Sequence, residues 1–487
     1  MKARSLKWAR RLPSAPRGEM QVDLQVPMQV DSIVQARQRL QFRRDSNAFF
    51  VALTEPQKAG DLKTLTVYFH GKPRAAIRPP WDGGFIWQRD SVGNRWVSTA
   101  DQGLGASVWW PNKDLQADKP DSQRIAITLP DPMVDVSNGR LRSTVKNADG
   151  TTTFEWFVTN PINNYSISVN AGTYAHWTET YAGLNGKLTM DFWPLANHLE
   201  QAKKQFAQAR PMIACFESWF GPYPWYADGY KLVEAPHLGM EHQSAVAYGN
   251  GFQNGYRGRD LSGTGEGLKW DFIIVHESAH EWFGNNVTAT DIADNWVHEG
   301  FANYAEGLYA ECQDGKVAGA KYIVGSRRNI TNRGTIIGNY GVNSEGSGDM
   351  YYKGGSMLHS IRQVINDDAK WHAILRGLNT TFGRKTVSSA EVERYISTQA
   401  GIDLSKVFDQ YLRSTNIPVL EYRVNGGTLS YRWTNVVQGF DMPVRVSAPR
   451  AAWTLIKPTT EWKTMSFTGK ELVVDENFYV TAKAAAD

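Results

Sequence analysis

The residues best suited to chemistry stand together in His276-Glu277-Ser278-Ala279-His280, an H-E-x-x-H pattern that follows the apolar run 272–275. On a helix, residues four apart share one face, so the two imidazoles would face one site, with Glu277 about 100° round at its edge. Neutral imidazoles can hold a zinc ion, and a carboxylate that does not bind the metal can take a proton from water. Taken alone, the pattern also fits a pair of buried core histidines.

A candidate third ligand is Glu299, which follows His280 after 18 intervening residues. That gap is long enough for one helix to end, for a turn at Gly284-Asn285-Asn286, and for a second helix to return a carboxylate to the metal. Two histidines and one glutamate leave the fourth tetrahedral position for water, which is typical of catalytic rather than structural zinc sites. The pattern therefore predicts one catalytic Zn²⁺ per chain.

Length and charge limit the possible classes of protein. A chain of 487 residues is too long for one core and predicts about two to four domains. The formal net charge of +4 is spread without a long basic block, so neither nucleic acid nor an anionic membrane surface is indicated as a partner. No apolar stretch is long enough to span a bilayer. The Gly-rich stretches 249–267 and 334–348 lack a phosphate-binding lysine at the required spacing, so we interpret them as surface or cleft loops.

Two cysteines, Cys215 and Cys312, are too few for a disulfide framework or a thiolate zinc site. Sequence alone does not decide whether they pair, and we favour two buried free thiols. The first 18 residues are basic but lack the apolar segment of a secretory signal. We therefore expect a soluble chain without a signal peptide, either cytoplasmic or exported if a leader is missing.

Short strands broken by turns are predicted from about Gln21 to Trp193. Apolar and polar residues alternate over 62–69, 124–129 and 165–170, which is the period of a half-buried strand. A β-rich first domain follows from these stretches and from turn signals at Asp82-Gly83-Gly84, Asp149-Gly150 and Asn185-Gly186.

After Pro194 the apolar period becomes that of a helix. One helix is predicted over 199–220, where Gly221-Pro222 stops it. Ser388 with Glu391 three residues later is a capping box that begins another. Helices are predicted in all over 199–220, 269–283, 296–310, 354–365, 371–378 and 389–396.

Strands return after Pro418, where 420–424 and 429–433 flank Asn425-Gly426-Gly427 as a hairpin. The sequence thus predicts a multidomain α+β fold. Its parts are a β-rich N-terminal domain (1–193), a mainly α catalytic domain (194–416) and a small C-terminal β-sandwich (417–487).

The H-E-x-x-H pattern, the 18-residue gap and Glu299-Gly300-Phe301-Ala302 together resemble the gluzincin zinc aminopeptidases of the aminopeptidase N and leukotriene hydrolase type. The resemblance covers most of the chain and implies a thermolysin-like catalytic domain. It implies that His276, His280 and Glu299 bind zinc and that Glu277 is the general base. Glu306, two turns beyond Glu299, would orient a ligand histidine, unless it is a solvated helix residue.

A second match is Leu238-Gly239-Met240-Glu241-His242, which resembles the family's G-x-M-E-N signature. By this resemblance Glu241 would bind the free α-amino group of a substrate, with Gly239 and Met240 beside it. Gln102, in a segment that resembles the family's other amine-binding stretch, would add a second contact; the alternative is a hydrogen bond within its own turn. An acylated or internal peptide would leave the buried carboxylate unpaired and would be rejected.

The third match is Tyr351-Tyr352-Lys353-Gly354, which is similar to the family's Y-x-K-G. It implies that Tyr351 donates a hydrogen bond to the oxyanion of the tetrahedral intermediate. The chain departs from the family at Leu238, at His242, and at His298, which replaces the asparagine before the ligand glutamate. For His298 we favour a packing role over a substrate contact.

These features predict a zinc-dependent aminopeptidase whose partners are peptides with a free N-terminus. The alternatives are a hydrolase of the same family with another main substrate, and a catalytically silent zinc-bearing peptide-binding protein. The printed sequence ends at Asp487, without the large helical domain that many relatives carry, so an open cleft is expected. The oligomeric state and the preferred first residue are not predicted.

Overall fold

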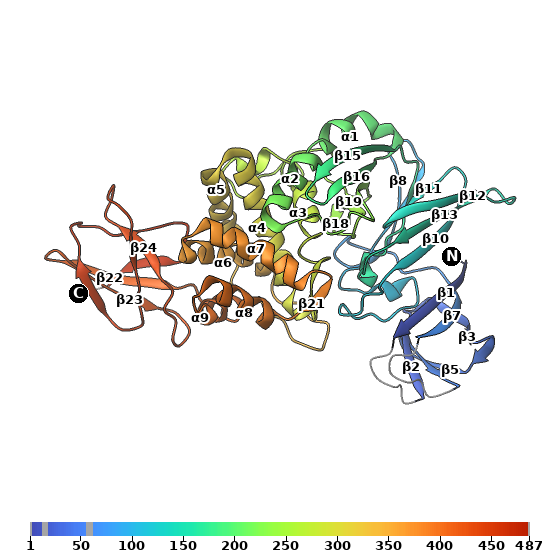
Figure 1. Ribbon diagram of the computed structural model, residues 1–487, viewed down its shortest axis with the longest axis horizontal. Coiled ribbons are helices and arrows are strands. Elements are labelled where there is room, and N and C mark those ends of the chain that lie inside the picture. The colour runs from blue at the N-terminus through green and yellow to red at the C-terminus, as the bar shows by residue number, and fades with distance from the viewer. Residues whose placement is uncertain (1, 12–17, 55–61, 486–487) are drawn as a thin grey trace. The chain divides into compact units, whose positions relative to one another are not determined.

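A computed structural model describes residues 2–11, 18–54 and 62–485 of the chain (Figure 1). The chain folds into two compact units. Unit 1 comprises the chain up to Thr180 together with Leu188–Lys203 and Trp225–Gly249; unit 2 comprises Tyr181–Lys187, Lys204–Pro224 and the chain from Asn250 onward. Part of the basic N-terminal stretch, residues 1 and 12–17, lies outside the described residues. The domain boundaries after 193 and 416 remain a prediction.

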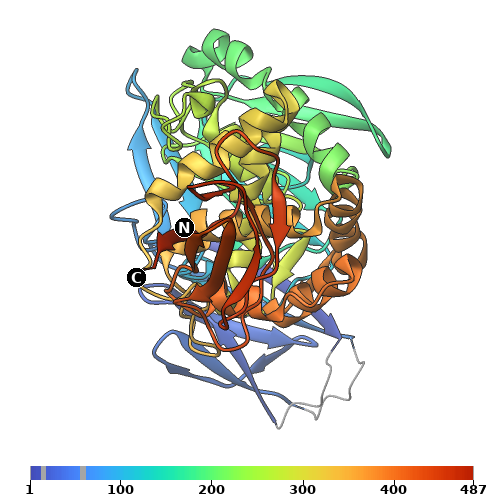
Figure 2. The same ribbon diagram turned by 90° about the vertical axis from the view of Figure 1, so that its left-hand side faces the viewer.

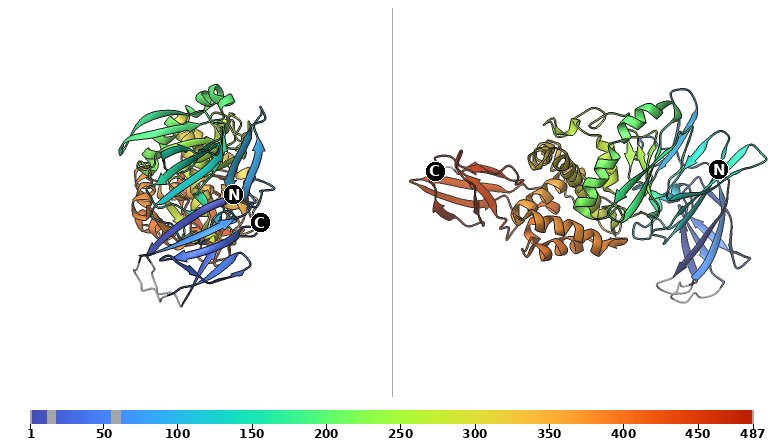
Figure 3. Two further views of the ribbon diagram at one scale, coloured as in Figure 1. Left: turned by 90° about the vertical axis from the view of Figure 1, so that its right-hand side faces the viewer. Right: turned by 45° about the horizontal axis from the view of Figure 1, so that its top comes forward.

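Unit 1 is built mainly of antiparallel sheets, with strand orders β1-β7-β3-β4, β2-β6-β5, β11-β14-β9-β8 and β10-β13-β12 (Figure 3). Its buried core includes Trp109, Trp110 and Trp156. The strands are β1 Lys2–Arg11, β2 Glu19–Asp23, β3 Gln29–Gln35, β4 Gln38–Leu40, β5 Phe42–Asp45, β6 Ala48–Ala52, β7 Leu62–His70, β8 Gly84–Arg89, β9 Arg95–Ala100, β10 Gln123–Pro130, β11 Val134–Val136, β12 Arg140–Lys146, β13 Thr151–Val158 and β14 Asn170–Gly172.

A fifth sheet, of order β15-β16-β17-β19-β18, carries the segment that resembles the amine-binding signature. Strands β16, β17 and β19 run parallel, and the short β18 pairs antiparallel with β19 at the edge. Its strands are β15 Trp177–Gly183, β16 Gly186–Trp193, β17 Tyr230–Glu234, β18 Gly239–Met240 and β19 Val246–Tyr248.

The strand predictions over 62–69 and 124–129 are confirmed by β7 and β10, and the predicted turn at Asn185-Gly186 joins β15 to β16. The predicted strand over 165–170 is wrong. This segment forms a 3-10 turn, Asn164–Ser166, and only its last residue enters β14. The alternation of apolar and polar residues does not mark a half-buried strand here, because the polar residues are buried as well. At Ser168 the backbone is held by a side chain instead of a neighbouring strand: the Ser168 backbone amide donates to the Asn138 side chain at 2.8 Å.

Unit 2 is mainly helical, and among the described residues no helix is long and apolar enough to cross a membrane. The short strands β20 Val287–Ala289 and β21 Lys385–Val387 pair in parallel between the helices. The helices, beginning with one that starts in unit 1, are α1 Leu199–Phe206, α2 Ala209–Phe220, α3 Phe272–Ala279, α4 Trp296–Asp314, α5 Lys316–Ser326, α6 Tyr352–Ile365, α7 Asp368–Phe382, α8 Ser389–Ala400 and α9 Ser405–Leu412.

Most helix predictions are confirmed, including the capping box of Ser388 and Glu391 at the start of α8. Several bounds are wrong, and two of the helices depart most from their predictions. The predicted helix 199–220 breaks at Gln208, whose side-chain oxygen accepts the Asp271 backbone amide at 2.8 Å. The helix predicted over 269–283 begins only at Phe272, because Asp271 caps it by accepting the amides of Ile273 and Ile274, and it ends at Ala279 instead of 283.

The C-terminal strands of unit 2 form two sheets, of orders β26-β23-β22-β28 and β25-β24-β27 (Figure 2). The predicted hairpin is confirmed by β22 and β23, and the predicted α+β class agrees with the whole sequence of elements. The strands are β22 Val419–Asn425, β23 Thr428–Thr434, β24 Val444–Ser447, β25 Thr454–Ile456, β26 Lys463–Ser466, β27 Val473–Val474 and β28 Thr481–Ala484.

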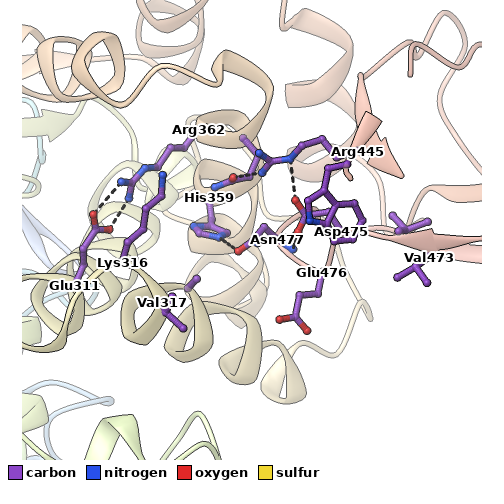
Figure 4. Close-up of a pocket in the computed structure, with 14 residues that line it drawn as sticks. Glu311, Lys316, Val317, His359, Arg362, Arg445, Val473, Asp475, Glu476 and Asn477 are labelled. Atoms are coloured by element: carbon purple, nitrogen blue, oxygen red, sulfur yellow. Dashed lines mark hydrogen bonds and ion pairs between the residues drawn. The ribbon is translucent and has the colours of Figure 1, made fainter. Parts of the chain in front are cut away.

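A cavity of about 560 Å³ lies within unit 2, between helices α4 to α6 and the C-terminal strands (Figure 4). Most of its charged lining is held in ion pairs. Arg362 binds Glu311 through two hydrogen bonds of 2.6 and 2.9 Å, and Arg445 Nε lies 2.8 Å from Asp475. Because these guanidinium groups are already paired, the cavity is best understood as a polar junction between the helices and the C-terminal strands.

Cys215 on α2 and Cys312 on α4 form a disulfide, with their Cα atoms 6.0 Å apart. The prediction of two free thiols is therefore wrong. Partners 97 residues apart in the sequence leave no local pattern, and only the packing of α2 against α4 brings them together. The bond cross-links these two helices.

Buried histidines make the fold sensitive to acid. Burial lowers the pKa of His359 to about 3, of His237 to about 4 and of His242 to about 3. A histidine in the unfolded chain has a pKa of about 6.5. Below that pH the unfolded chain therefore binds protons that the buried histidines of the folded chain do not bind. Stability is therefore fully present above about pH 6.5 and is lost as the pH falls toward 4, by about 1.4 kcal/mol per pH unit for each histidine.

The measurement is urea unfolding at pH 7 and pH 5, in the wild type and in the His359→Gln variant. His359 Nε2 lies 2.9 Å from Asn477 Oδ1, and a glutamine can still donate a hydrogen bond there. We expect the variant to lose about 2 kcal/mol less than the wild type between the two pH values. Equal losses would contradict the assignment.

Candidate functional site

Helix α3 places the H-E-x-x-H pattern inside unit 2. All of its residues from Phe272 to Ala279 are buried, so packing on every side holds it rather than one amphipathic face. The helix ends at Ala279, with His280 as its C-cap. His276 and His280 still face the same point, since their Nε2 atoms lie 3.4 Å apart.

Glu299, in the first turn of α4, completes a cluster with the two histidines. Its Oε2 atom lies 3.4 Å from His276 Nε2 and 3.4 Å from His280 Nε2. The three atoms thus form a nearly equilateral triangle. A tetrahedral zinc ion with bonds of about 2.0–2.1 Å would separate its ligand atoms by about 3.3–3.4 Å. The three atoms match one face of that tetrahedron, so the cluster fits zinc.

Hydrogen bonds set the tautomer of both histidines. His276 Nδ1 lies 2.7 Å from Glu306 Oε1, and His280 Nδ1 lies 3.0 Å from the Phe283 carbonyl oxygen. Each Nδ1–H donates to its oxygen, so each Nε2 presents a lone pair to the cluster. Glu306 is 1% exposed. The alternative of a solvated helix residue is therefore excluded.

The electrostatics of the cluster favour an ionised ligand carboxylate. Burial raises the pKa of Glu299, but the positive charge of His280 and His276 in their protonated forms outweighs that effect and holds the pKa well below its usual range. Glu277 is buried, at 9% exposed, on the same helix as the histidines. A carboxylate in this position has the chemistry of a general base.

Tyr351 is held next to the cluster by the contact of α4 with α6. Its ring stacks on His276 with centroids 5.9 Å apart. Two motif glycines allow the helices to approach closely, because a Cβ added at Gly354 would lie 3.0 Å from the Gly300 Cα atom. The glycine after Glu299 and the glycine after Lys353 therefore set the spacing between the predicted metal ligand and the predicted oxyanion donor.

A Gly354→Ala substitution tests this spacing. Alanine normally stabilises a helix by about 1 kcal/mol over glycine. Here its Cβ would push α4 and α6 apart and displace Tyr351 from Glu299, so we expect peptide hydrolysis to fall about 10- to 100-fold in kcat/KM. Gly348→Ala is the matched control, because a Cβ there meets nothing within 4 Å, three residues before Tyr351. Equal activities in the two variants would contradict the role of the glycine contact.

A second polar cluster lies within unit 1. Glu241 follows β18 directly and is 3% exposed. Gln102 Nε2 donates to Glu241 Oε1 at 2.6 Å, and the Tyr165 hydroxyl donates to the same oxygen at 3.1 Å. Gln102 therefore reaches Glu241, 139 residues away, instead of bonding within its own turn. Gly239 and Met240 form β18 and are buried beside it.

Tyr165 was missed because its segment resembles a strand, and no spacing in the sequence links it to Glu241. The two departures beside Glu241 are both buried: Leu238 is 7% and His242 0% exposed. His298 takes the packing role that the sequence favoured, since its Nε2 accepts the Ala289 amide of β20 at 2.8 Å.

Comparisons with known proteins agree with this geometry. Residues 206–411, which contain the His276, His280 and Glu299 cluster, match the Peptidase family M1 domain. The chain is 22% identical to the probable aminopeptidase 1 of Sulfurisphaera tokodaii over 237 residues, which are 46% of this chain and 30% of that protein. It is 30% identical to aminopeptidase Ey of Gallus gallus over 134 residues, 26% of this chain and 13% of that protein. The matched region is thus less than a third of either relative's length.

Solved structures share the fold more widely than the sequence matches show. An M1 zinc metallopeptidase from Deinococcus radiodurans superposes with a TM-score of 0.72 at 20% identity, covering 85% of this chain and 90% of that one. A variant of that enzyme bound to a Tyr-Ser-Ala substrate superposes with a TM-score of 0.68 at 21% identity, covering 84% of this chain and 88% of that one. The segment that matches the M1 domain contains the cluster, so residues 206–411 form a domain of the M1 peptidase type, that of the gluzincin aminopeptidase N family.

Proposed function

We propose that the protein is a zinc-dependent aminopeptidase that releases N-terminal amino acids from peptides. The observation that carries the proposal is the 3.4 Å triangle of His276, His280 and Glu299 in unit 2. These three residues would hold one Zn²⁺ per chain. When bound, zinc supplies Lewis-acid chemistry, which lowers the pKa of a coordinated water and polarises a carbonyl group.

The protein's own residues then carry the proton and the charge. Glu277 takes a proton from the attacking water and passes it to the leaving amine. Tyr351 donates a hydrogen bond to the carbonyl oxygen as negative charge develops there. Tyr351 is half-buried, so part of its side chain is exposed to solvent.

Selection for a free N-terminus is proposed to rest on Glu241 and Gln102. The buried Glu241 carboxylate would pair with the substrate's ammonium group. Gln102 already donates to Oε1 of Glu241 through its Nε2, so its carbonyl oxygen is the atom able to accept from the ammonium. Met240 and Gly239 would line the same subsite. The peptide-bound structural relative supports peptides as the substrate class.

The test is hydrolysis of amino-acid anilides with a free or an acetylated amine, before and after removal of zinc by a chelator. We expect cleavage of the free forms only, loss of activity without metal, and recovery when zinc is restored. Equal cleavage of acetylated and free substrates would rule out an aminopeptidase and leave another hydrolase of the family. Zinc-dependent peptide binding without any cleavage would favour the silent binding protein.

We further propose that the protein works in an oxidising compartment. The disulfide between Cys215 and Cys312 supports this choice between the two locations that the sequence left open, because such bonds are rare in reducing cytosol. Counting free thiols in protein taken from its native source tests it: none is expected, and two would favour a cytosolic protein.

A further inference from the structure

The carboxylate of Glu306 receives hydrogen bonds on both of its oxygens. Oε1 lies 2.7 Å from Nδ1 of His276. Oε2 accepts from the Tyr322 hydroxyl at 2.6 Å and from the Asn303 side-chain amide at 3.0 Å. Glu306 and Tyr322 are each 1% exposed, so water does not compete for these bonds. A continuous chain of hydrogen bonds thus runs from a ligand histidine to a tyrosine on another helix.

Helix α5, which carries Tyr322, is held firmly against α4. A Cβ added at Gly319 would lie 2.6 Å from the Gly307 carbonyl oxygen, so the two helices pack backbone to backbone. The Tyr322 ring also packs on Trp270, with centroids 5.1 Å apart. The hydroxyl therefore has a fixed position relative to Glu306.

The direction of the hydrogen bond follows from the acidity of the phenol. Burial raises the pKa of Tyr322, and the Glu306 charge raises it further, to well above its ordinary value. The phenol stays protonated and must be the donor. A buried carboxylate with one donor fewer would be less well stabilised as an anion, and its hold on the Nδ1 proton of His276 would change.

We infer that Tyr322 is a positioning residue of the metal site: its hydroxyl, together with Asn303, fixes Glu306 in the orientation that directs His276 Nε2 toward the metal. This inference rests on the proposed function only in that the cluster binds zinc. Partners of this kind typically change metal affinity about 10- to 100-fold when they are lost. Since Asn303 still donates to Glu306 when the hydroxyl is removed, an effect near the lower limit is expected.

The experiment measures zinc affinity by competition with a chelator, without substrate. We expect Tyr322→Phe to bind zinc about tenfold more weakly than the wild type. Tyr309→Phe is the matched control: Tyr309 is 2% exposed and its ring packs on the same Trp270 at 5.8 Å, but among the described residues the hydrogen bonds to Glu306 come from His276, Asn303 and Tyr322. Its affinity is expected to equal that of the wild type.

A double-mutant cycle separates positioning from general loss of packing. In the Glu306→Gln background the hydroxyl has no carboxylate to hold, so Tyr322→Phe is expected to weaken zinc binding much less than in the wild type. Thermal unfolding of the metal-free variants measures how much each substitution changes the stability of the fold.

An unchanged affinity in Tyr322→Phe, an equal loss in Tyr309→Phe, or the same loss with and without Glu306 would each overturn the inference. No zinc binding by the wild type would overturn both this inference and the proposed function. Zinc affinities in the expected order, but without peptide hydrolysis, would support the inference and overturn the function.

Discussion

The Glu277→Gln variant is expected to retain zinc and lose peptide hydrolysis, with kcat falling about 10³-fold and KM nearly unchanged. Glutamine keeps the shape of the side chain but has no basic oxygen to take a proton from water. Positioned proton transfer typically contributes about 10²- to 10⁴-fold, and its loss acts on the chemical step rather than on binding. Steady-state kinetics together with the zinc content of the purified variant make the measurement.

Glu281→Gln provides the matched control for this variant. Glu281 is also buried and lies one turn further along the chain, where its carboxylate accepts from the Tyr223 hydroxyl at 3.0 Å and from Asn285 at 3.2 Å. Its loss should lower stability and leave most of the activity. If Glu277→Gln kept a kcat near that of the control, Glu277 would not be the base.

The second large effect is expected for Glu241→Gln. The buried carboxylate would no longer pair with the substrate's ammonium group, which is the kind of loss that costs about 2–5 kcal/mol, or roughly 30- to 5,000-fold in kcat/KM for free-amine substrates. An acetylated substrate never forms this pair, so its slow cleavage should hardly change. The ratio of the two rates is therefore the quantity to measure, with the rate for the acetylated form taken as an upper limit where no cleavage is detected.

Glu234→Gln serves as the control for Glu241 within unit 1. Glu234 is also buried, but it bonds His198 at 2.7 Å and the Leu195 amide at 2.8 Å instead of lying beside β18. We expect that variant to lose stability while keeping the preference for a free amine. A preference that survives in Glu241→Gln would contradict the assignment of the amine site.

Much of the metal site could be predicted because its geometry is local. His276 and His280 are one helical turn apart. The 18 residues between His280 and Glu299 are enough for a turn and for the start of a second helix that carries Glu299. Glu306 shares a helix with Glu299, so its side of α4 was also predictable. These positions depend on the helical period, which a sequence displays directly.

Contacts between distant segments were harder to predict. Tyr165 and Tyr322 each donate one hydrogen bond across a sequence gap with no repeating pattern, and the alternation around Tyr165 concealed a buried polar turn. Gln102 was found only through family resemblance. Hydrogen bonds of this kind depend on tertiary packing, which residue spacing does not encode.

The disulfide between Cys215 and Cys312 has a topological consequence for the metal site. The covalent ring that it closes contains all three proposed ligands, His276, His280 and Glu299, as well as Glu306. In the unfolded chain these side chains remain tethered within one loop, so their mutual search is confined and their effective concentration is raised. A bond between two cysteines that are not themselves proposed ligands thus helps the unfolded chain to bring the proposed ligands together again.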